Sequence, residues 1–314
     1  MVDSKQQWKA WLYLAPAIVL LLVFTVWPMI NTVRMAFLVD YKGLAAAGGQ
    51  KFEFGFGNFS KVVQYKGFLN CLKNTCLLCV LTVPISTLLA LVIAVCLNSI
   101  KPLSRLLQTI FFLPYVTNSI AIGMVFATMF NMIGSFYGTQ KEIITTAGII
   151  NNVIEFFGGT RINWINQGSS YIANLTVMVI YIVWNALPFK ILILLGGLQS
   201  VNKQYYDAAK VDGTSRWRVF WRITVPLLSP MIIYVVITGF IGGFKEYSSI
   251  IGVFGENMGP AGDKGRLNTM VGFIYDALST NNQGRASAAA LILFGIILIV
   301  TLLQLYVSKK RVHY

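Results

Sequence analysis

The chain has 314 residues, of which 56% are hydrophobic and 11% charged, and its mean hydropathy is +0.67. Soluble domains carry about 25% charged residues. This composition, arranged in long apolar blocks, therefore indicates a membrane protein with several spans. The net charge of +14 does not favour nucleic-acid binding, because no DNA- or RNA-binding motif accompanies it and the basic residues mostly flank apolar segments.

Six apolar segments each exceed the ~20 residues that a helix needs to cross a bilayer. The first follows Lys5 and Lys9, but it is too long for a signal peptide and lacks a small-x-small cleavage site. We therefore expect an all-α polytopic membrane protein, folded as a single permease-type domain over residues 1–314. The expected spans are residues 11–37, 68–97, 106–130, 171–195, 226–253 and 286–307.

The basic residues are concentrated on one side of these spans. That side carries twelve of them against three acids, Asp3, Asp207 and Asp212. The positive-inside rule then predicts that both termini and residues 204–226 lie in the cytoplasm. The opposite side has three long loops, residues 40–65, 133–170 and 254–284. The twelve basic residues are Lys5, Lys9, Lys101, Arg105, Lys203, Lys210, Arg216, Arg218, Arg222, Lys309, Lys310 and Arg311.

The sequence offers little for metal, redox or nucleotide chemistry. Cys76 and Cys79 form a C-x-x-C, but they lie in an apolar run without a second pair, and His313 is the one histidine. Zinc or redox sites need more ligands and polar surroundings, so inert buried thiols are the favoured interpretation. No G-x-x-x-x-G-K-[ST] phosphate loop is present, so we expect no cofactor in this chain.

A polar, basic segment at residues 204–226 interrupts the apolar sequence. It contains Asp207-Ala208-Ala209, three residues, Gly213, nine residues, and then Ile223-x-Val225-Pro226. The first part can form a short helix, and Gly213 permits a left-handed turn after it. The aromatic residues that follow can pack on a partner or at the interface. An amphipathic helix that merely anchors the chain at the membrane surface is the alternative.

The spacing of this segment resembles the EAA motif of permease subunits in bacterial ABC importers. Asp207 replaces the glutamate of that motif and Val225 its leucine. The resemblance implies that the helix before the glycine docks into a cleft of a cytoplasmic ATPase and transmits its closure. The implied ATPase-coupling residues are Asp207, Ala208, Ala209, Asp212 and Gly213.

Further patches occur in the order found in sugar-type permeases, specifically the large-subunit class of maltose transporters. They are Phe112-Leu113-Pro114-Tyr115, Ile162-Asn163-Trp164, Trp184, Pro188-Phe189, Gly197-Leu198-Gln199-Ser200, a blurred Met258-Gly259-Pro260, and Ala286-Ser287-Ala288. Residues 140–161 depart from the pattern.

The resemblance implies a type I ABC importer permease fold in the bacterial cytoplasmic membrane. The implied partners are a second permease subunit in a heterodimer, ATPase subunits that bind ATP and Mg, and an external solute-binding protein. The solute would be a sugar, with an oligosaccharide favoured and a glycerol-phosphate-type solute as the minor alternative.

Lys245 and Glu246 are ionisable residues inside the fifth expected span, where charge is costly unless a cavity or partner receives it. Neighbouring helical residues point about 100° apart, so we expect Glu246 to face the solute path and Lys245 a neighbouring helix or subunit. A purely structural ion pair is the alternative. The resemblance places Gly243 on the same path.

Tyr181 and Asn185 suit a sugar by stacking and hydrogen bonding, although for each residue taken singly a packing role is favoured. Lys190 is a weaker candidate that could snorkel to the cytoplasmic interface. Other classes fit less well. A secondary transporter would favour an internal repeat, and an enzyme would need a cluster of catalytic side chains; neither is seen in the sequence, so we predict that the chain is not an enzyme.

Overall fold

The computed structural model describes residues 7–100, 104–136 and 142–311, and these residues are mostly helical. Among the basic residues counted above, Lys5 and Lys101 lie outside this part. The α-helices are α1 (Gln7–Leu21), α2 (Trp27–Phe37), α3 (Gly43–Ala47), α4 (Gly57–Gln64), α5 (Phe68–Ser99), α6 (Ser104–Val116), α7 (Ser119–Phe130), α8 (Ile149–Phe156), α9 (Tyr171–Ser200), α10 (Gln204–Val211), α11 (Arg216–Val219), α12 (Val225–Leu227), α13 (Ser229–Phe244), α14 (Ser248–Phe254), α15 (Met270–Ser279) and α16 (Gln283–Arg311).

Four described helices are long and apolar enough to cross a membrane, and two bent pairs bring the number to six. The predicted all-α fold with about six spans is therefore confirmed. The four are Trp8–Phe37, Phe68–Ser99, Tyr171–Ser200 and Gln283–Lys309. The bent pairs are Thr109–Val116 with Ser119–Phe130, at 105°, and Arg216–Leu227 with Ser229–Phe244, at 67°.

The chain divides into two compact units, which we describe separately. Unit 1 comprises Met1–Leu69 with Phe273–Gly295, and unit 2 comprises Asn70–Gly272 with Ile296–Tyr314. The prediction of a single domain over the whole chain stays a prediction.

In unit 1, the first span contains a π-helical turn at Leu22–Val26, which ends two residues before Pro28. A proline lacks the N–H that an α-helix needs and crowds the preceding turn, and a wider π turn accommodates both effects. A second π turn, Phe220–Thr224 in unit 2, likewise ends two residues before a proline, Pro226.

The loop after α2 in unit 1 is held by Asn58, whose side chain is buried. Its Nδ2 donates to the carbonyl oxygens of Leu38 and Ala36 at 2.7 and 3.0 Å, and its Oδ1 accepts from the N–H of Asp40. Gln283 at the start of α16 accepts from the N–H of Gly43. Unit 1 therefore depends on buried backbone hydrogen bonds as well as apolar packing.

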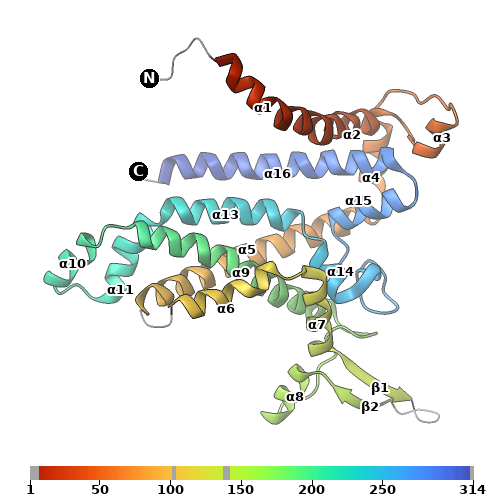
Figure 1. The fold of residues 1–314 in the computed structure, drawn as a ribbon. Coiled ribbons are helices and arrows are strands. Elements are labelled where there is room, and N and C mark those ends of the chain that lie inside the picture. Colours follow the sequence, from red (N-terminus) through yellow and green to blue (C-terminus); the bar gives the residue numbers. More distant parts are fainter. Residues whose placement is uncertain (1–6, 101–103, 137–141, 312–314) are drawn as a thin grey trace. The chain divides into compact units, whose positions relative to one another are not determined.

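In unit 2, α5, α6, α9 and α13 run alongside one another, with α10 and α11 at one end and α7 and α14 at the other (Figure 1). Two apolar clusters form the core. One joins α5 and α9 to α7 and α14, around Met178 and Ile250. The other joins α5, α9 and α13 toward the end that carries α10, around Leu194 and Val235.

Two predicted spans are broken rather than continuous. The third divides at Thr117–Asn118, where the Oδ1 of Asn118 accepts from the N–H of Ile120 and begins α7. The fifth ends as a helix at Phe244, and α14 begins only at Ser248. The expectation that Lys245 and Glu246 are consecutive residues of one helix is therefore wrong. At each break a side chain accepts from N–H groups at the start of the next helix, Asn118 for α7 and Glu246 for α14.

The loop between α7 and α9 contains a small antiparallel hairpin of β1 (Met132–Phe136) and β2 (Glu142–Ala147), followed by α8. The register shifts between Ile133 and Gly134. β2 and α8 belong to residues 140–161, which depart from the maltose-type pattern, and residues 140 and 141 lie outside the described part. The hairpin is the one exception to the all-helical expectation among the described residues.

Candidate functional site: residues 204–226 and a cavity between helices

Residues 204–226, which we call the docking segment after the role that their spacing implies, begin with α10, an eight-residue helix. The Oδ1 of Asn202 accepts from the N–H of Gln204 at 3.0 Å and starts the helix. Asp207 and Ala208 are exposed, whereas Ala209 is buried. The motif residues therefore divide into one that packs inward and two that are accessible to a partner.

Gly213 ends this helix in a left-handed conformation, with φ of +62°. The N–H of Thr214 donates to the carbonyl of Ala209 at 2.9 Å, and the N–H of Gly213 donates to that of Lys210 at 3.1 Å. This pair of bonds defines a Schellman turn, in which glycine avoids the steric penalty of a β-carbon. The predicted left-handed turn at Gly213 is confirmed.

A cavity of about 650 Å³ lies between the docking segment and the ends of α5 and α9. Tyr206 of α10 lies against it, and its hydroxyl is 3.4 Å from that of Thr224. Val95 of α5 and Leu198 of α9 contribute to the opposite wall. A cavity thus separates part of the docking segment from the ends of α5 and α9.

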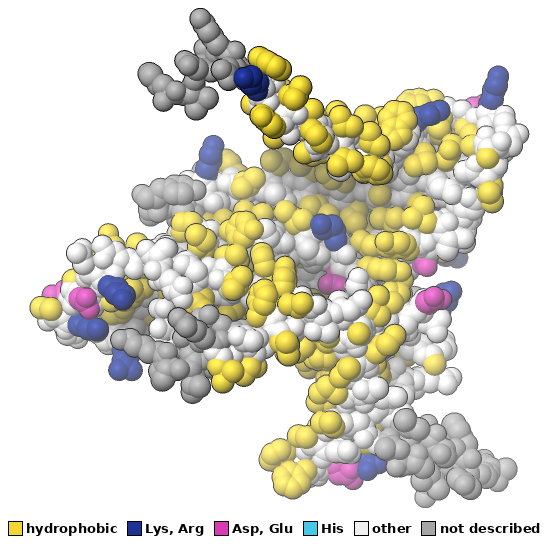
Figure 2. Space-filling view, viewed as in Figure 1, with side chains coloured by type: hydrophobic (Ala, Val, Ile, Leu, Met, Phe, Trp, Pro, Cys, Tyr) yellow, Lys and Arg dark blue, Asp and Glu magenta, His cyan; other side chains and the backbone are white. Residues whose placement is uncertain are grey.

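The exposed surface of this segment is charged and aromatic. Figure 2 shows basic and acidic side chains gathered at the end of unit 2 that holds α10 and α11. Lys210 forms an exposed ion pair with Asp207 at 3.5 Å, while Val211 and Trp217 are 89% and 72% exposed. These two apolar side chains are therefore accessible to a partner or to the membrane interface.

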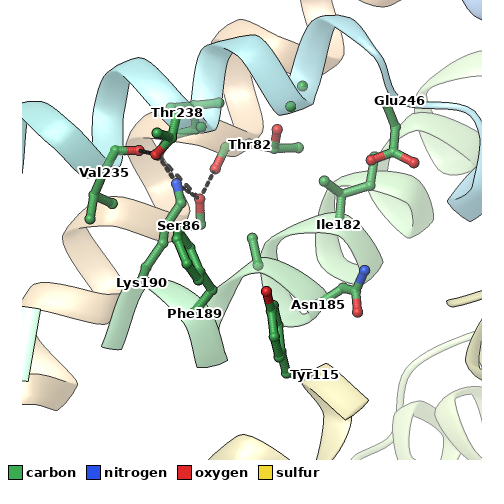
Figure 3. Close-up of a pocket in the computed structure, with 15 residues that line it drawn as sticks. Thr82, Ser86, Tyr115, Ile182, Asn185, Phe189, Lys190, Val235, Thr238 and Glu246 are labelled. Atoms are coloured by element: carbon green, nitrogen blue, oxygen red, sulfur yellow. Dashed lines mark hydrogen bonds between the residues drawn. The ribbon is translucent and has the colours of Figure 1, made fainter. Parts of the chain in front are cut away.

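A second cavity, of about 310 Å³, lies between the helices of unit 2 (Figure 3). Its size falls at the low end of the range for small-molecule sites, about 300–1,000 Å³. It is lined from four helices and the break after α13. The lining residues are Thr82, Val83, Ser86, Tyr115, Ile182, Asn185, Ala186, Phe189, Lys190, Val235, Thr238, Gly239, Gly242, Gly243 and Glu246.

Two aromatic rings form part of this cavity wall. Tyr115 of α6 and Phe189 of α9 lie with centroids 6.0 Å apart and ring planes at 17°. Asn185 lies one helical turn from Phe189, and its Nδ2 is 3.4 Å from the hydroxyl of Ser119. An aromatic surface beside an amide is suited to a sugar ring, which offers an apolar face and hydroxyl groups.

Glu246 lines the cavity from the break between α13 and α14. Its Oε1 accepts from the backbone N–H groups of Tyr247 and Ser249, at 3.2 and 3.1 Å. Thr269 donates its hydroxyl to the Glu246 carbonyl at 2.9 Å. The carboxylate is therefore held by the start of α14, whereas Lys245 is exposed and does not line the cavity.

Lys190 is buried, with 4% of its surface exposed. Its Nζ donates to Ser86 Oγ at 2.7 Å, Thr87 Oγ1 at 2.9 Å and the Val83 carbonyl at 3.2 Å. All three acceptors belong to α5, so Lys190 connects α9 to α5 and does not snorkel to the interface as the sequence suggested. It also lines the cavity, on the side away from Glu246 (Figure 3).

Of the two remaining residues predicted on the solute path, one lines the cavity and the other does not. Gly243 lines the cavity and packs on α5, because a β-carbon there would lie 2.8 Å from the Sγ of Cys79. Tyr181 does not line it. The Tyr181 side chain is fully buried in the core, 4.8 Å from the ring of Phe126, and its hydroxyl donates to the carbonyl of Ser119.

Within the described residues, no group of three or more His, Cys, Asp or Glu side chains could hold a metal ion. Cys76 and Cys79 lie within α5 and form no disulfide. Neither cysteine lines the cavity.

The part of the chain that matches a known family includes the docking segment and nearly all of the residues that line the second cavity. Residues 83–313 match the family described as the binding-protein-dependent transport system inner membrane component. This chain belongs to that family. It is a transport permease of the membrane, and not an enzyme.

Three curated relatives align with this permease along most of its length. The lactose transport system permease protein LacF of Rhizobium radiobacter is 29% identical, over 96% of this chain and 95% of its own. The arabinooligosaccharides transport system permease protein AraP of Halalkalibacterium halodurans is 28% identical, over 97% and 89%. The sn-glycerol-3-phosphate transport system permease protein UgpA of Agrobacterium fabrum is 28% identical, over 97% and 96%.

A solved structure supports the fold of this permease. It is a chain of a bacterial ABC transporter involved in the import of the acidic polysaccharide alginate. Its TM-score is 0.77 at 21% identity, and the alignment covers 98% of this chain and 97% of that one. The expected ABC importer permease fold is confirmed.

Sequence reasoning missed several cavity residues of the permease. Tyr115 and Phe189 were noticed only as marks of the family. Ser86 was not noticed at all, nor was Thr87, which contacts Lys190 without lining the cavity. A signal for the last two was present, since hydroxyl residues cluster around Pro84 in an apolar span. Which side of α5 they face depends on a contact with Lys190, more than a hundred residues away.

Proposed function

We propose that this permease forms half of the translocation path of an ATP-driven importer for a sugar. A second permease subunit completes the path, a cytoplasmic ATPase hydrolyses ATP with Mg, and an external binding protein delivers the solute. The observation that carries the proposal is the docking segment. A motif with the spacing of an ATPase-coupling helix is folded as a helix and a Schellman turn, with Asp207 and Ala208 accessible.

The proposed orientation has both termini and α10 in the cytoplasm. The bias of basic residues supports it, and so does the position of α10 and α11 at one end of unit 2, opposite α7 and α14 (Figure 1). The proposed coupling residues are Asp207, Ala208, Ala209, Asp212 and Gly213. Of these, Ala209 supports the helix from inside, and Gly213 sets the direction in which the chain leaves it.

An oligosaccharide is the favoured solute for two reasons. LacF and AraP carry names of sugar transport systems and align with nearly the whole permease. The cavity combines the stacked Tyr115 and Phe189 with Asn185 and Glu246, and carboxylate and amide oxygens accept hydrogen bonds from sugar hydroxyls. A glycerol-phosphate-type solute is the second candidate, favoured by the alignment with UgpA.

The test is purification through a tag on this chain, followed by reconstitution in proteoliposomes. The proposal expects an ATPase and a second permease to copurify, and sugar uptake to require both ATP and the binding protein. Screening that binding protein against a glycan panel that includes glycerol 3-phosphate would identify the solute. Uptake driven by an ion gradient without ATP would instead identify a secondary transporter and reject the proposal.

A further inference from the structure

Lys190 is a buried cation whose hydrogen-bond partners are all formally neutral. The described ion pairs are those of Lys61 with Asp40, Arg161 with Glu155, Lys210 with Asp207, and Arg266 with Asp263, and none of them includes Lys190. Its three acceptors are two hydroxyls and one carbonyl of α5. Removing a charge from water is costly unless an opposite charge compensates it.

One of the three Lys190 hydrogen bonds is weaker than the others. The carbonyl oxygen of Val83 also lies within hydrogen-bond distance of Thr87 Oγ1, at 2.7 Å, and of Ser86 Oγ, at 3.2 Å. A carbonyl has two lone pairs, so three side-chain donors compete for it. The bond from Lys190 is long, at 3.2 Å. A ligand oxygen could therefore replace the Val83 carbonyl as the acceptor for this N–H of the Lys190 ammonium group.

Glu246, on the other side of the cavity, is placed differently. Its carboxylate accepts from two backbone N–H groups, so local donors stabilise its charge. Figure 3 shows Glu246 separated from Lys190, with Ile182 and Asn185 in the region between them. The two charges thus do not form a pair, and the cavity wall carries a cation at one side and a hydrogen-bond acceptor at the other.

We propose that the transported solute carries an acid group, a carboxylate or a phosphate ester, which lies against Lys190 during passage. The hydroxyl groups of the same solute lie toward Asn185 and Glu246, and its ring stacks on Tyr115. This inference rests on the proposed function and specifies the charge of the sugar. The ammonium group supplies the charge complement in a cavity of low dielectric constant, where a single charge pair is worth more than in water.

The test measures ATP-dependent uptake by the complete importer in proteoliposomes, with matched acidic and neutral probes. One pair is trigalacturonate and its methyl ester, and the other is glycerol 3-phosphate and glycerol, so that the two arms separate a carboxylate from a phosphate. Maltotriose serves as an unmodified neutral oligosaccharide. We expect an acidic probe to be transported faster than its neutral counterpart at low salt.

Variants then assign the preference to Lys190. Lys190→Met should lower uptake of the acidic probe by about tenfold or more while sparing the neutral counterpart, since truncating one member of a close charge pair weakens binding strongly. Lys190→Arg keeps the charge and should retain the preference. Lys73→Met is the matched control, because it removes a positive charge from an exposed position of α5.

The wild-type measurement decides the inference even if Lys190→Met fails to assemble. Uptake of maltotriose or the methyl ester without a preference for either acid would overturn it, and would indicate that a carboxylate of the partner subunit compensates Lys190. An unchanged acid preference in an assembled Lys190→Met importer would overturn it too. Absence of ATP-dependent uptake for every probe would instead count against the proposed function.

Discussion

Gly123 of α7 and Gly252 of α14 cross with their backbones in contact. A β-carbon on Gly123 would lie 2.6 Å from the Cα of Gly252, and one on Gly252 would lie 2.9 Å from the Cα of Gly123. These are the helices that follow the two breaks in the third and fifth spans. The close approach therefore joins the second helices of two broken spans, next to the break that positions Glu246.

Gly123→Ala should destabilise the permease, although alanine favours helices over glycine by about 0.5–1 kcal/mol. The added methyl group meets backbone, which cannot rotate away, and overpacking costs about 1–3 kcal/mol. We expect a lower midpoint of thermal unfolding in detergent. Gly196→Ala in α9 is the matched control, because open space surrounds its β-carbon position. A midpoint at or above wild type for Gly123→Ala would contradict the crossing.

Gly213→Val should impair coupling, because a β-branched residue disfavours the left-handed conformation that the turn after α10 requires. A left-handed residue other than glycine costs about 1–2 kcal/mol. Asparagine tolerates this conformation better, so Gly213→Asn should be milder. Gly213→Pro should abolish transport, since it also removes the N–H that donates to Lys210.

The measurement for these variants is binding-protein-stimulated ATP hydrolysis and solute uptake, with membrane insertion checked by protein level. Asp207→Lys combined with Ala208→Lys should block ATPase association, because both residues are exposed on α10. Normal stimulated hydrolysis in Gly213→Pro would exclude the turn from coupling.

Glu246→Gln should change solute affinity or transport rate without loss of assembly. The amide oxygen of glutamine can still accept from Tyr247 and Ser249, so the break before α14 is preserved, while the charge facing the cavity is removed. Lys245→Met, at an exposed residue that does not line the cavity, should mainly weaken association with the second permease. Uptake kinetics and copurification separate the two effects, and unchanged uptake in Glu246→Ala would remove Glu246 from the path.

Topology can be tested by single-cysteine labelling in a cysteine-free background. Cysteines at Gly48 and Gly262 should react with an impermeant reagent added from outside, and one at Thr214 should not. The bias of basic residues motivates this expectation. External labelling at position 214 would reverse the orientation and remove the docking role of α10 with it.

Asn74→Ala should destabilise unit 2 by at least about 1–3 kcal/mol, the cost of leaving buried polar groups unsatisfied. Asn74 is fully buried. Its Nδ2 donates to the carbonyls of Arg266 and Asn268, and its Oδ1 accepts from the hydroxyl of Tyr171. Thermal unfolding measures the effect.

Asn70→Ala, one turn earlier on α5, is the matched control for Asn74→Ala. Its exposed side chain reaches the same loop through a single 3.5 Å contact with the Gly265 carbonyl. We expect a change within about 0.5 kcal/mol, as for most surface substitutions. Equal losses in the two variants would show that the burial of Asn74 does not matter.

The number of spans and the docking turn followed from local features of the sequence. Apolar length specifies a membrane span because an unsatisfied backbone is too costly in lipid for anything but a helix or a barrel. The turn at Gly213 followed from a glycine placed just after a short helix, where the bonds that form it join residues at most five apart. Such features depend on a few neighbouring residues, so pattern and spacing are sufficient.

Only the tertiary structure decided which residues form the cavity. Lys190 contacts α5 across more than a hundred residues of sequence, and hydropathy alone made it a residue that could snorkel. The breaks beside Glu246 and Asn118 allow α7 and α14 to pack at Gly123 and Gly252, and a hydropathy window averages across both breaks. Tyr181 shows the converse, since its residue type suits a sugar while packing buries it in the core. Residue type gives the chemistry that a side chain can perform, but long-range packing decides what it faces.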